Sequence, residues 1–599
     1  MVVAGSRRVL VRQLPEVSKP LTAGAAVCVA IGAVLPIAFA VATGAAVAAV
    51  PVAVGGGLRS PAGQHLLNTV ILVGVLLAAQ QTLSPIQDAV TNILSRRVQM
   101  RIYRRSMVAA LQPRTIAHLE DPELLDLVAG ATLLSPGGPN GAVRNVLNQS
   151  RRYISGAASL LLVAHYRWWL AILLFGAELA LLQRHRALYS EMVSFRARQL
   201  PGLRRSVYLR GLAMNPDAAK ETRIFGLAGW VVERFRGEWL ETMTRLWEQR
   251  RGSVLRLLAA AVPVFAILLL SVWLMGRDAI DGSISLGAMV AYASALFATM
   301  QLVMPGDDFA IEEGAAVVRK TVELEKIVAS DARLRLPGDH SPPQAAPQRD
   351  IRVEGVRFRY PGRDDDVLHD LDLVIPAGRS LAIVGDNGAG KTTLVKLLAR
   401  LYDPAQGRIV VDGVDLRDID AAGWQARVAA VFQDFVRYPM TAAANVGFGA
   451  KRNGAHNDAA RRADALELVE GLPHGWDTVL TREFDGGVDL SGGEWQRLAL
   501  ARALFAAAAT GGGLLILDEP TAHLDARAEA SFIGGFLDVT RGCTTIVISH
   551  RFSTVRRADR IVVLEGGRII ETGSHDELVA LGGRYAEMFT LQAERFTDA

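Results

Sequence analysis

One apolar run near the amino terminus limits what this chain can fold into. Between Leu21 and Val54 the only ionisable side chain is that of Cys28. About 20 apolar residues span the hydrocarbon layer of a bilayer as a helix, and this run is longer. A cleaved secretory leader is the alternative, because arginines precede the run and Ala38-Phe39-Ala40 lies within it. The length of the run, and the apolar segments that follow it, favour a retained membrane span.

Five further segments are apolar enough to be predicted as spans. The third and fourth predicted spans are short and weakly separated. An even number of spans places both ends of the membrane region on the same side. The further predicted spans are Leu66–Leu83, Ile154–His165, Trp168–Leu182, Leu257–Met275 and Ile284–Met304.

Arginines indicate which side of the membrane the loops face. They are concentrated in two long connections, from Arg96 to Arg152 and from Arg184 to Arg251. The other three connections carry essentially Arg59, Arg167 and Arg277. The positive-inside rule therefore predicts that both termini and the two long connections are cytoplasmic. The formal charge of +5 is then a topology signal, and no nucleic-acid partner is expected.

The two long connections mix charge with apolar residues at helical spacing. This pattern predicts that membrane helices continue into the cytoplasm and that a short helix crosses each tip. The predicted tips are Leu119–Leu127 and Asp217–Phe225. A solvated charged loop is the alternative, but apolar residues such as Ile224, Phe225 and Trp230 disfavour it.

Four segments are predicted from these shifts in composition. They are a cytoplasmic tail at 1–20, a membrane domain of six helices at 21–329, a Pro-rich linker at 330–349 and an α/β domain at 350–599. The helix of the last span is expected to run on to about Ala329. The α/β domain is long enough to bury a substantial core.

A phosphate-binding loop is predicted near the start of the α/β domain. The apolar strand Leu381–Val384 is followed by the pattern G-x-x-x-x-G-K-T and then by a helix predicted at Thr393–Leu401. Glycines allow backbone N–H groups to surround phosphates, and the helix amino terminus adds positive potential. A glycine-rich turn that carries a lysine by chance is the alternative, and the strand–loop–helix context disfavours it. The predicted ATP-binding residues here are Gly385, Asp386, Asn387, Gly388, Ala389, Gly390, Lys391, Thr392 and Thr393.

Two carboxylates follow a second apolar strand, Leu514–Leu517. At the carboxyl end of a buried strand, Asp518 is predicted to hold Mg²⁺ together with Thr392. Glu519 is predicted to activate the attacking water as a general base. A surface strand that ends in acids is the alternative, but four consecutive apolar residues favour a buried parallel strand.

The segment from Leu490 to Ala503, LSGGEWQRLALARA, resembles the signature of the ATP-binding cassette (ABC) exporters, and the chain resembles one half-transporter of that family. Ser491, Gly492 and Gly493 open a helix and form a second anion site. The resemblance implies that these residues contact the γ-phosphate held by a partner's P-loop. It therefore implies a dimer, formed with an identical or a homologous half, around two ATP molecules.

The other motifs of the family occur in the expected order. Tyr360 is similar to the aromatic residue that stacks on adenine, and Gln433 to the Q-loop residue that contacts Mg²⁺ or water. Asp525 is similar to the D-loop aspartate. His550, which follows the apolar strand Thr544–Ile548, resembles the switch histidine that contacts the γ-phosphate. The resemblance implies Glu519, His550 and Gln433 as the catalytic set.

The resemblance extends less specifically to the membrane half. Ala219–Gly226 is similar to the second coupling helix of these exporters, and Leu286–Tyr292 to the start of their sixth span. The segment Thr481–Gly487 departs from the family pattern before the signature, which puts its usual glutamate role in doubt. None of the departures removes a catalytic group.

The sequence indicates the cargo less clearly than it indicates the ATP site. Phe432–Tyr438 and Glu494–Arg497 resemble segments of exporters of lantibiotic-type modified peptides, and other small-molecule exporters can share these segments, so the predicted cargo is a small molecule, lipid or peptide. Glu178 is an intramembrane acid and hence a candidate cargo contact, with Gln80, Gln301 and Tyr292 as further candidates; helix-to-helix hydrogen bonding is the alternative for all four. The leading hypothesis is ATP-driven efflux across a bacterial cytoplasmic membrane. Import of a chelate-type substrate and a nucleotide-gated channel or regulatory ATPase are the alternatives.

Overall fold

The computed structural model describes residues 2–57, 59–132, 138–198, 200–215, 218–304, 307–331, 334, 336–342, 346–448, 454–509, 513–520 and 543–597. These residues form two compact units. We call residues 1–109 with 127–325 the helical unit, and residues 110–126 with 326–599 the sheet unit. Asp217 and Asp525, which the sequence singles out, lie outside the described residues.

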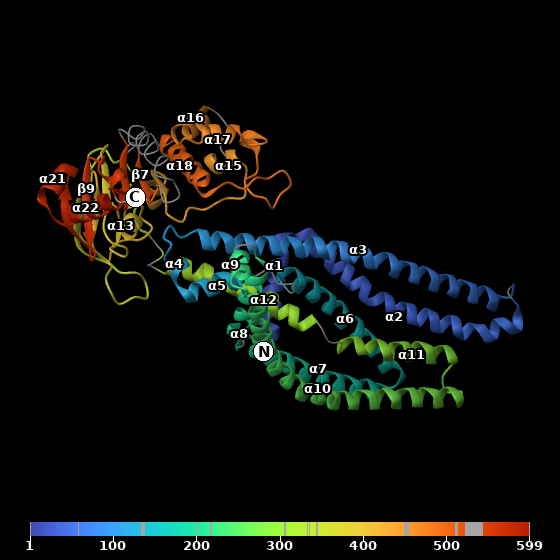
Figure 1. Ribbon diagram of the computed structural model, residues 1–599. Coiled ribbons are helices and arrows are strands. Elements are labelled where there is room, and N and C mark those ends of the chain that lie inside the picture. The colour runs from blue at the N-terminus through green and yellow to red at the C-terminus, as the bar shows by residue number, and fades with distance from the viewer. Residues whose placement is uncertain are drawn as a thin grey trace. The chain divides into compact units, whose positions relative to one another are not determined.

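Long helices make up the helical unit (Figure 1). Neighbours that pack together include α2 with α6 and α11, α6 with α7, and α10 with α7 and α8. The helices are α1 (Val2–Val17), α2 (Lys19–Gly56), α3 (Pro61–Leu111), α6 (Pro139–Tyr166), α7 (Trp168–Arg198), α8 (Leu200–Met214), α9 (Ala219–Ile224), α10 (Ala228–Ile280), α11 (Leu286–Thr299), the 3₁₀ turn η1 (Met300–Leu302) and α12 (Asp307–Ser330). The last turn of α3 and the last turns of α12 belong to the sheet unit, and α5 (Pro122–Thr132) spans both.

Three of the described helices are long and apolar enough to cross a membrane: Lys19–Gly55, Pro61–Leu111 and Val254–Ile280. They contain the predicted first, second and fifth spans. The predicted sixth span, Ile284–Met304, contains a shorter apolar helix, Leu286–Leu302. The third and fourth predicted spans lie within α6 and α7, and the first half of α6 is polar because it carries Arg144, Arg151 and Arg152.

The last membrane helix differs from the prediction. A continuous helix from Ile284 to about Ala329 is wrong, because α11 ends at Thr299, η1 ends at Leu302 and α12 begins only at Asp307. The sequence supplies the reason. Residue 305 is proline, which disfavours helical geometry in the residue before it, and residue 306 is glycine.

Small residues let α2 and α11 approach closely. A Cβ atom placed on Gly287 would lie 2.0 Å from the carbonyl oxygen of Gly44, and one on Gly44 would lie 2.5 Å from that of Gly287. Glycines at such a crossing allow backbones to pack directly, as is common between membrane helices.

Within the predicted tail, α1 packs against other helices of its unit. Leu10 and Leu14 lie in one buried cluster with Val98 and Ile102 of α3 and with Ile311 of α12. These two leucines are four residues apart and therefore share a helix face. An ion pair between Arg7 and Asp308, 2.6 Å long, adds a polar contact to the same region.

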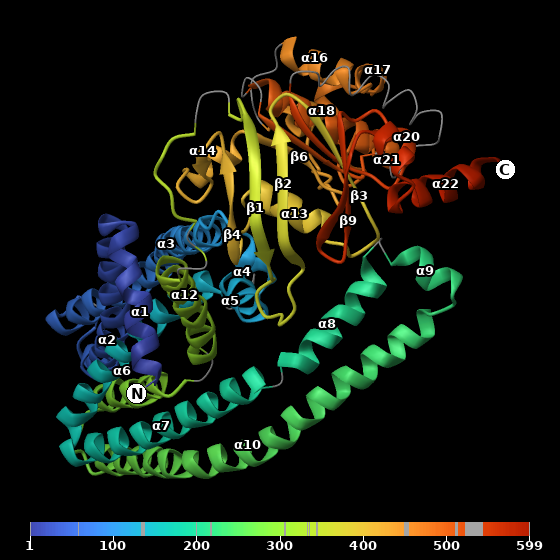
Figure 2. The same cartoon turned by 90° about the vertical axis from the view of Figure 1, so that its left-hand side faces the viewer.

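The second arginine-rich connection forms helices up to its tip. Helix α8 leads to the short α9, and α10 returns from it as one long helix (Figure 2). The predicted tip at Asp217–Phe225 thus contains a helix from Ala219 to Ile224. Ile224 and Phe225 are strongly exposed there, at 80% and 69%.

The sheet unit holds two β-sheets. One is antiparallel with the strand order β2-β1-β4-β5, and the other has the order β10-β9-β3-β8-β7-β6 (Figure 2). In the second sheet β9, β3, β8, β7 and β6 are parallel, and β10 is antiparallel to β9. The strands are β1 (Asp350–Phe358), β2 (Leu368–Pro376), β3 (Ser380–Val384), β4 (Gln406–Val411), β5 (Val414–Asp415), β6 (Val428–Val431), β7 (Leu514–Asp518), β8 (Thr544–Ile548), β9 (Arg560–Glu565) and β10 (Arg568–Gly573).

Helices pack against the parallel sheet. One buried cluster joins Trp476 and Trp495 to Leu517 of β7 and Val547 of β8. The helices are α13 (Lys391–Leu398), α14 (Ala421–Gln425), α15 (Ala442–Gly447), α16 (Gly454–Arg462), α17 (Leu466–Glu470), α18 (Gly492–Ala509), α20 (Phe552–Val555), α21 (His575–Leu581) and α22 (Arg584–Thr597). Helix α13 begins earlier than the predicted Thr393–Leu401 because Gly390, with φ of 101°, forms its amino-terminal cap, and it ends earlier, with Ala399 as its carboxyl-terminal cap.

The tip of the first arginine-rich connection belongs to the sheet unit. The predicted helix at Leu119–Leu127 is in fact α4 (Ala117–Glu120) followed by α5. The Thr115 hydroxyl donates to the Leu401 carbonyl oxygen at 2.8 Å. Lys396 Nζ lies 3.1 Å from Glu120 Oε1, and the Tyr402 hydroxyl donates to the other oxygen of Glu120.

Candidate nucleotide site

The carboxyl ends of the parallel strands gather the predicted motifs at one edge of the sheet. The P-loop follows β3, Asp518 ends β7 and Glu519 comes directly after it. His550 follows β8, and Gln433 follows β6. Ligand sites in open α/β sheets form at this edge, because the loops that leave adjacent parallel strands converge there. The sequence could predict this convergence from the apolar strands alone.

The P-loop turns tightly around its own lysine. Gly385 has φ of 148°, and a Cβ on it would lie 2.0 Å from the Leu564 carbonyl oxygen. The Lys391 ammonium donates to the carbonyl oxygens of Gly385, at 2.7 Å, and of Asp386, at 2.9 Å. Burial lowers the pKa of Lys391, and the nearby carboxylates oppose that shift. The loop therefore holds a partly buried cation at the start of α13.

Thr392 and Asp518 form the candidate magnesium pair. The Thr392 hydroxyl donates to Asp518 Oδ2 at 2.9 Å, and Asp518 is only 3% exposed. Burial raises the pKa of Asp518, and the Glu519 carboxylate beside it adds to that effect. A hydroxyl and a carboxylate side by side fit Mg²⁺, which takes few protein oxygens and completes its shell with water and phosphate.

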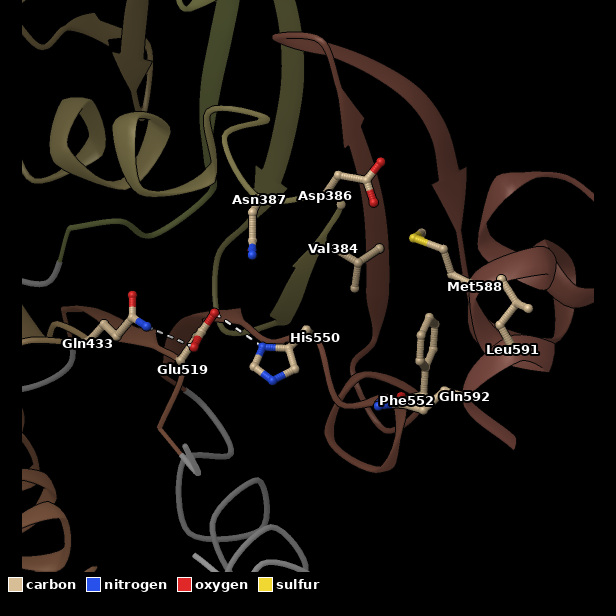
Figure 3. Close-up of a pocket in the computed structure, with 11 residues that line it drawn as sticks. Val384, Asp386, Asn387, Gln433, Glu519, His550, Phe552, Met588, Leu591 and Gln592 are labelled. Atoms are coloured by element: carbon tan, nitrogen blue, oxygen red, sulfur yellow. Dashed lines mark hydrogen bonds and ion pairs between the residues drawn. The ribbon is translucent and has the colours of Figure 1, made fainter. Parts of the chain in front are cut away.

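Glu519 is held between two other predicted catalytic residues (Figure 3). His550 Nδ1 lies 3.2 Å from Glu519 Oε1, and Gln433 Nε2 donates to Glu519 Oε2 at 3.2 Å. The backbone N–H of Glu519 donates to the Ile548 carbonyl oxygen at 2.9 Å. Glu519 has a positive φ of 51°, which is uncommon for a residue with a side chain and is found at functional sites.

Tyr360 lies in an aromatic cluster beside α13. Its hydroxyl is 3.0 Å from the Thr393 hydroxyl, and its ring is perpendicular to those of Phe358, at 5.0 Å, and Tyr402, at 5.6 Å. Lys396 Nζ lies 5.1 Å from the centre of the Tyr360 ring. An aromatic ring fixed next to the P-loop helix is suited to stack on a nucleotide base.

A cavity of about 650 Å³ connects several of these residues. Its polar wall contains Asn387, Gln433, Glu519 and His550, which point toward one another in Figure 3. The opposite wall is more apolar. Its described lining residues are Val384, Phe552, Met588 and Leu591, with Gly385, Asp386 and Gln592 beside them.

The first residues of the signature form the amino terminus of helix α18. The Ser491 backbone N–H donates to Glu494 Oε2 at 2.7 Å, and the Glu494 backbone N–H donates to Ser491 Oγ at 3.4 Å. This reciprocal pair is a capping box at the amino terminus of α18. Ser491, Gly492 and Gly493 are not among the described lining residues of the cavity. The structure therefore does not bring the signature and the P-loop of one chain together in that cavity.

Three residues near the site were missed in the sequence. Gln496 Nε2 contacts the Glu519 carbonyl oxygen at 3.4 Å, Gln592 Oε1 accepts from the Phe552 backbone N–H at 2.9 Å, and Arg584 pairs with Asp386. Gln496 lies within the signature, so its position was available as a signal. Gln592 and Arg584 belong to the last helix and carry no recognisable local pattern.

The four predicted cargo contacts lie in different surroundings. Glu178 is 1% exposed, and neither of its carboxyl oxygens makes a well-formed hydrogen bond with a described residue. Gln80 has a buried amide nitrogen without such a partner, and Gln301 is half-buried in η1. The Tyr292 ring packs on Tyr166, with centroids 5.2 Å apart, next to the α6–α7 connection.

Comparison with known proteins agrees with this geometry. Residues 368–522 match the family model described as "ABC transporter". A relative named "ATP-dependent lipid A-core flippase" from Chromohalobacter salexigens is 40% identical over 329 residues, which is 54% of each chain. A protein of the same name from Alkalilimnicola ehrlichii is 36% identical over 386 residues, which is 62% of each chain. The matches thus span about half to three fifths of these relatives' length.

A solved structure supports the architecture of nearly the whole chain. This structure, "Structure of a bacterial Atm1-family ABC exporter with ATP bound", aligns with a TM-score of 0.76 over 96% of this chain and 98% of that chain. The sequence identity is 23%, so the likeness concerns the fold. Residues 368–522 thus belong to a domain of the ABC transporter family, and the fold of nearly the whole chain is that of the aligned ABC exporter, in which a helical domain is followed by a nucleotide-binding domain.

Proposed function

We propose that this chain is one half of an ATP-driven exporter. It binds ATP at the P-loop, hydrolyses it, and moves a small molecule, lipid or peptide out of the cytoplasm. The observation that carries the proposal is the position of Glu519, within 3.2 Å of both His550 and Gln433, at the sheet edge that also carries Lys391 and the Thr392–Asp518 pair. An ATPase site of this kind, in a chain with membrane-length helices, points to transport driven by ATP.

Each side chain has one task in the hydrolysis. The Lys391 ammonium exchanges its carbonyl acceptors for the β- and γ-phosphate oxygens, and Tyr360 stacks on the adenine. Glu519 accepts a proton from water while the water oxygen bonds to the γ-phosphorus and the bridging bond to the β-phosphate breaks. His550 and Gln433 orient Glu519 and the water. Thr392 and Asp518 would hold Mg²⁺, which neutralises charge on the phosphates when bound.

A second half completes the site in this proposal. Gly492 and Gly493 place their backbone N–H groups at the start of α18, beside the Ser491 hydroxyl, an arrangement that suits an anion. Because the cavity of this chain is lined by other residues, the signature of a partner is proposed to contact its γ-phosphate. The partner is a second copy or a homologous half.

Closure of such a dimer around two ATP molecules is proposed to turn a cargo cavity outward, and hydrolysis to reset it. We place the protein in a bacterial cytoplasmic membrane, with both termini in the cytoplasm. The relatives' name refers to lipid A-core, and this makes an amphiphilic lipid the first cargo class to test. Glu178, Gln80, Gln301 and Tyr292 remain the proposed cargo contacts.

The test is transport by the full chain in proteoliposomes. ATP-dependent accumulation of a fluorescent lipid or peptide in inside-out vesicles supports export, and accumulation only in the opposite orientation supports import. Movement that follows the electrochemical gradient without hydrolysis indicates a channel. Glu519→Gln is expected to abolish accumulation, and unchanged accumulation in this variant would overturn the mechanism.

A further inference from the structure

The P-loop of this chain carries an acid at its second position. Asp386 lies between Gly385 and Asn387, in the loop proposed to bind a triphosphate. A carboxylate here repels the phosphates, since like charges interact unfavourably over several ångströms near a protein surface. Asp386 is also one of the three carboxylates whose charge acts on Lys391. Left free, it would compete with the nucleotide for the P-loop lysine.

The Asp386 carboxylate forms an ion pair with one arginine. Arg584 Nη2 lies 2.9 Å from Asp386 Oδ2, although the two residues are 198 positions apart. The same guanidinium contacts Glu587 Oε2 at 2.8 Å and Glu565 at 3.6 Å. The hydrogen bonds to Glu587 and Asp386 raise the pKa of Arg584, so it stays charged throughout the physiological range.

Arg584 is held on a well-anchored element. It is the first residue of α22, whose amino terminus is capped by Glu571: the backbone N–H groups of Arg584 and Tyr585 donate to its two carboxylate oxygens. The Tyr585 side chain is fully buried, 5.2 Å from the Phe552 ring, and its hydroxyl lies 2.8 Å from His575 Nδ1. The arginine therefore approaches the P-loop from a fixed direction.

We infer that Arg584 is a positioning residue for nucleotide binding: it pairs with Asp386 and keeps that carboxylate away from Lys391 and from the triphosphate. The inference rests on the proposed ATPase function and names a residue of the same site. The Arg584 and Asp386 side chains are 32% and 61% exposed, and exposed ion pairs contribute little to folding. The effect is thus expected on nucleotide affinity and not on stability.

The test is a mutant cycle in the full chain, reconstituted in lipid nanodiscs. ATPase activity is measured against MgATP concentration for Arg584→Met, Asp386→Asn and the double variant. Arg584→Met is expected to raise KM about fivefold with kcat changed less than twofold, an effect of the size that one uncompensated charge exerts on a polyanion. Asp386→Asn is expected to lower KM, and the double variant to match it. Arg584→Lys is expected to restore most of the affinity.

Two further measurements distinguish the effect of the Arg584 charge on KM from an effect of its packing. The KM difference for Arg584→Met is expected to shrink at higher salt, because screening weakens exposed charges. Arg379→Met is the matched control: it removes an ion pair of 3.0 Å with Asp559 beside the opposite end of β3, and it is expected to leave KM unchanged. An unchanged KM in Arg584→Met, or an equal rise in the Asp386→Asn background, would overturn the inference.

Failure of the inference is distinguishable from failure of the proposed function. Equilibrium binding of trinitrophenyl-ATP is measured for the same variants, and this readout needs no hydrolysis. If the unmodified chain binds the probe without hydrolysing ATP, the proposed function fails, while the affinities still test Arg584. In this binding assay, Arg584→Met is expected to bind the probe about fivefold more weakly than the unmodified chain, as in the KM measurement. Adding Asp386→Asn is expected to abolish this loss of affinity.

Discussion

His550 Nδ1 lies 3.2 Å from Glu519 Oε1. Glu519 follows β7 and His550 follows the adjacent parallel strand β8, so this contact links the segments that leave the two strands. Gln433, from the end of β6, holds the other carboxylate oxygen. The proposed base is therefore oriented before any nucleotide arrives. An oriented base loses little freedom in the transition state, and this is a main source of rate in active sites.

Glu519→Gln is expected to lower kcat for ATP at least 100-fold, because an amide cannot accept the proton of water. Nucleotide binding is expected to persist, since Lys391 and the P-loop are unchanged. ATPase rates and trinitrophenyl-ATP binding measure the two effects. The matched control is Glu467→Gln on the exposed surface of α17, which is expected to behave as the unmodified chain. Retained turnover in Glu519→Gln would show that Glu519 is not the base.

The sequence predicted this edge of the sheet well for a physical reason. Strands β7 and β8 are buried along their whole length, and such strands read as continuous apolar runs whose ends must meet. The contact between Arg584 and Asp386 was not predictable, because exposed ion pairs leave no periodic pattern. The break after Leu302 was signalled by the proline and glycine at 305 and 306, yet the apolar content of the preceding segment favoured a continuous helix.

Asp518 is expected to make nucleotide binding sensitive to acid. Burial raises its pKa, so in the ligand-free protein the folded state holds the proton more tightly than the unfolded chain does. Stability contributed by this group is therefore present at low pH and lost as pH rises through the raised pKa. Magnesium needs the charged form, so the Mg²⁺ concentration for half-maximal ATPase activity is expected to rise as pH falls.

Asp518→Asn tests the same argument without a pH change. The ligand-free variant is expected to be more stable by about 1 kcal/mol, because a neutral amide avoids the cost of a buried carboxylate. Its Tm is expected to respond much less to MgATP than that of the unmodified chain. Thermal unfolding with and without MgATP measures both effects. A lower Tm of the ligand-free variant would contradict the assigned cost of burial.

Glu120 is expected to fix the tip of the first connection on the sheet unit. It contacts Lys396 at 3.1 Å and accepts from the Tyr402 hydroxyl, whose pKa is raised by burial and by Glu120. Glu120→Ala is expected to weaken docking of 115–120 by about 1 kcal/mol, the typical net value of such hydrogen bonds. Faster amide exchange in that segment measures the loss. Glu123→Ala, on the exposed side of α5, is the control.

Gly287 is expected to tolerate no side chain. Its Cβ would lie 2.0 Å from the Gly44 carbonyl oxygen, so Gly287→Ala must push α2 and α11 apart. A loss of at least about 2 kcal/mol is expected, as for overpacked cores. Thermal stability in detergent measures it. Gly74→Ala is the matched control within α3, because nothing lies within 4 Å of its added Cβ. Equal behaviour of the two variants would show that the α2–α11 crossing is loose.

Substitution of Glu178 is expected to affect protein stability and cargo transport in different ways. It follows Leu174 and precedes Leu181 on the buried face of α7. The Thr299 hydroxyl lies nearby, but it donates its hydrogen to the Leu296 carbonyl oxygen at 2.8 Å. A carboxyl in such a place costs stability, and intramembrane acids persist where function requires them.

Glu178→Gln keeps the shape of the side chain and removes its charge. The variant is expected to unfold at the same or a higher temperature, while cargo-stimulated ATPase activity and vesicle transport fall at least fivefold. Basal ATPase activity, measured without cargo, reports on the nucleotide site and is expected to stay within twofold. Ser294→Ala is the control, because its exposed hydroxyl on α11 donates only to the Val290 carbonyl oxygen of its own helix. Full transport by Glu178→Gln would assign this carboxyl to helix packing and remove it from the cargo path.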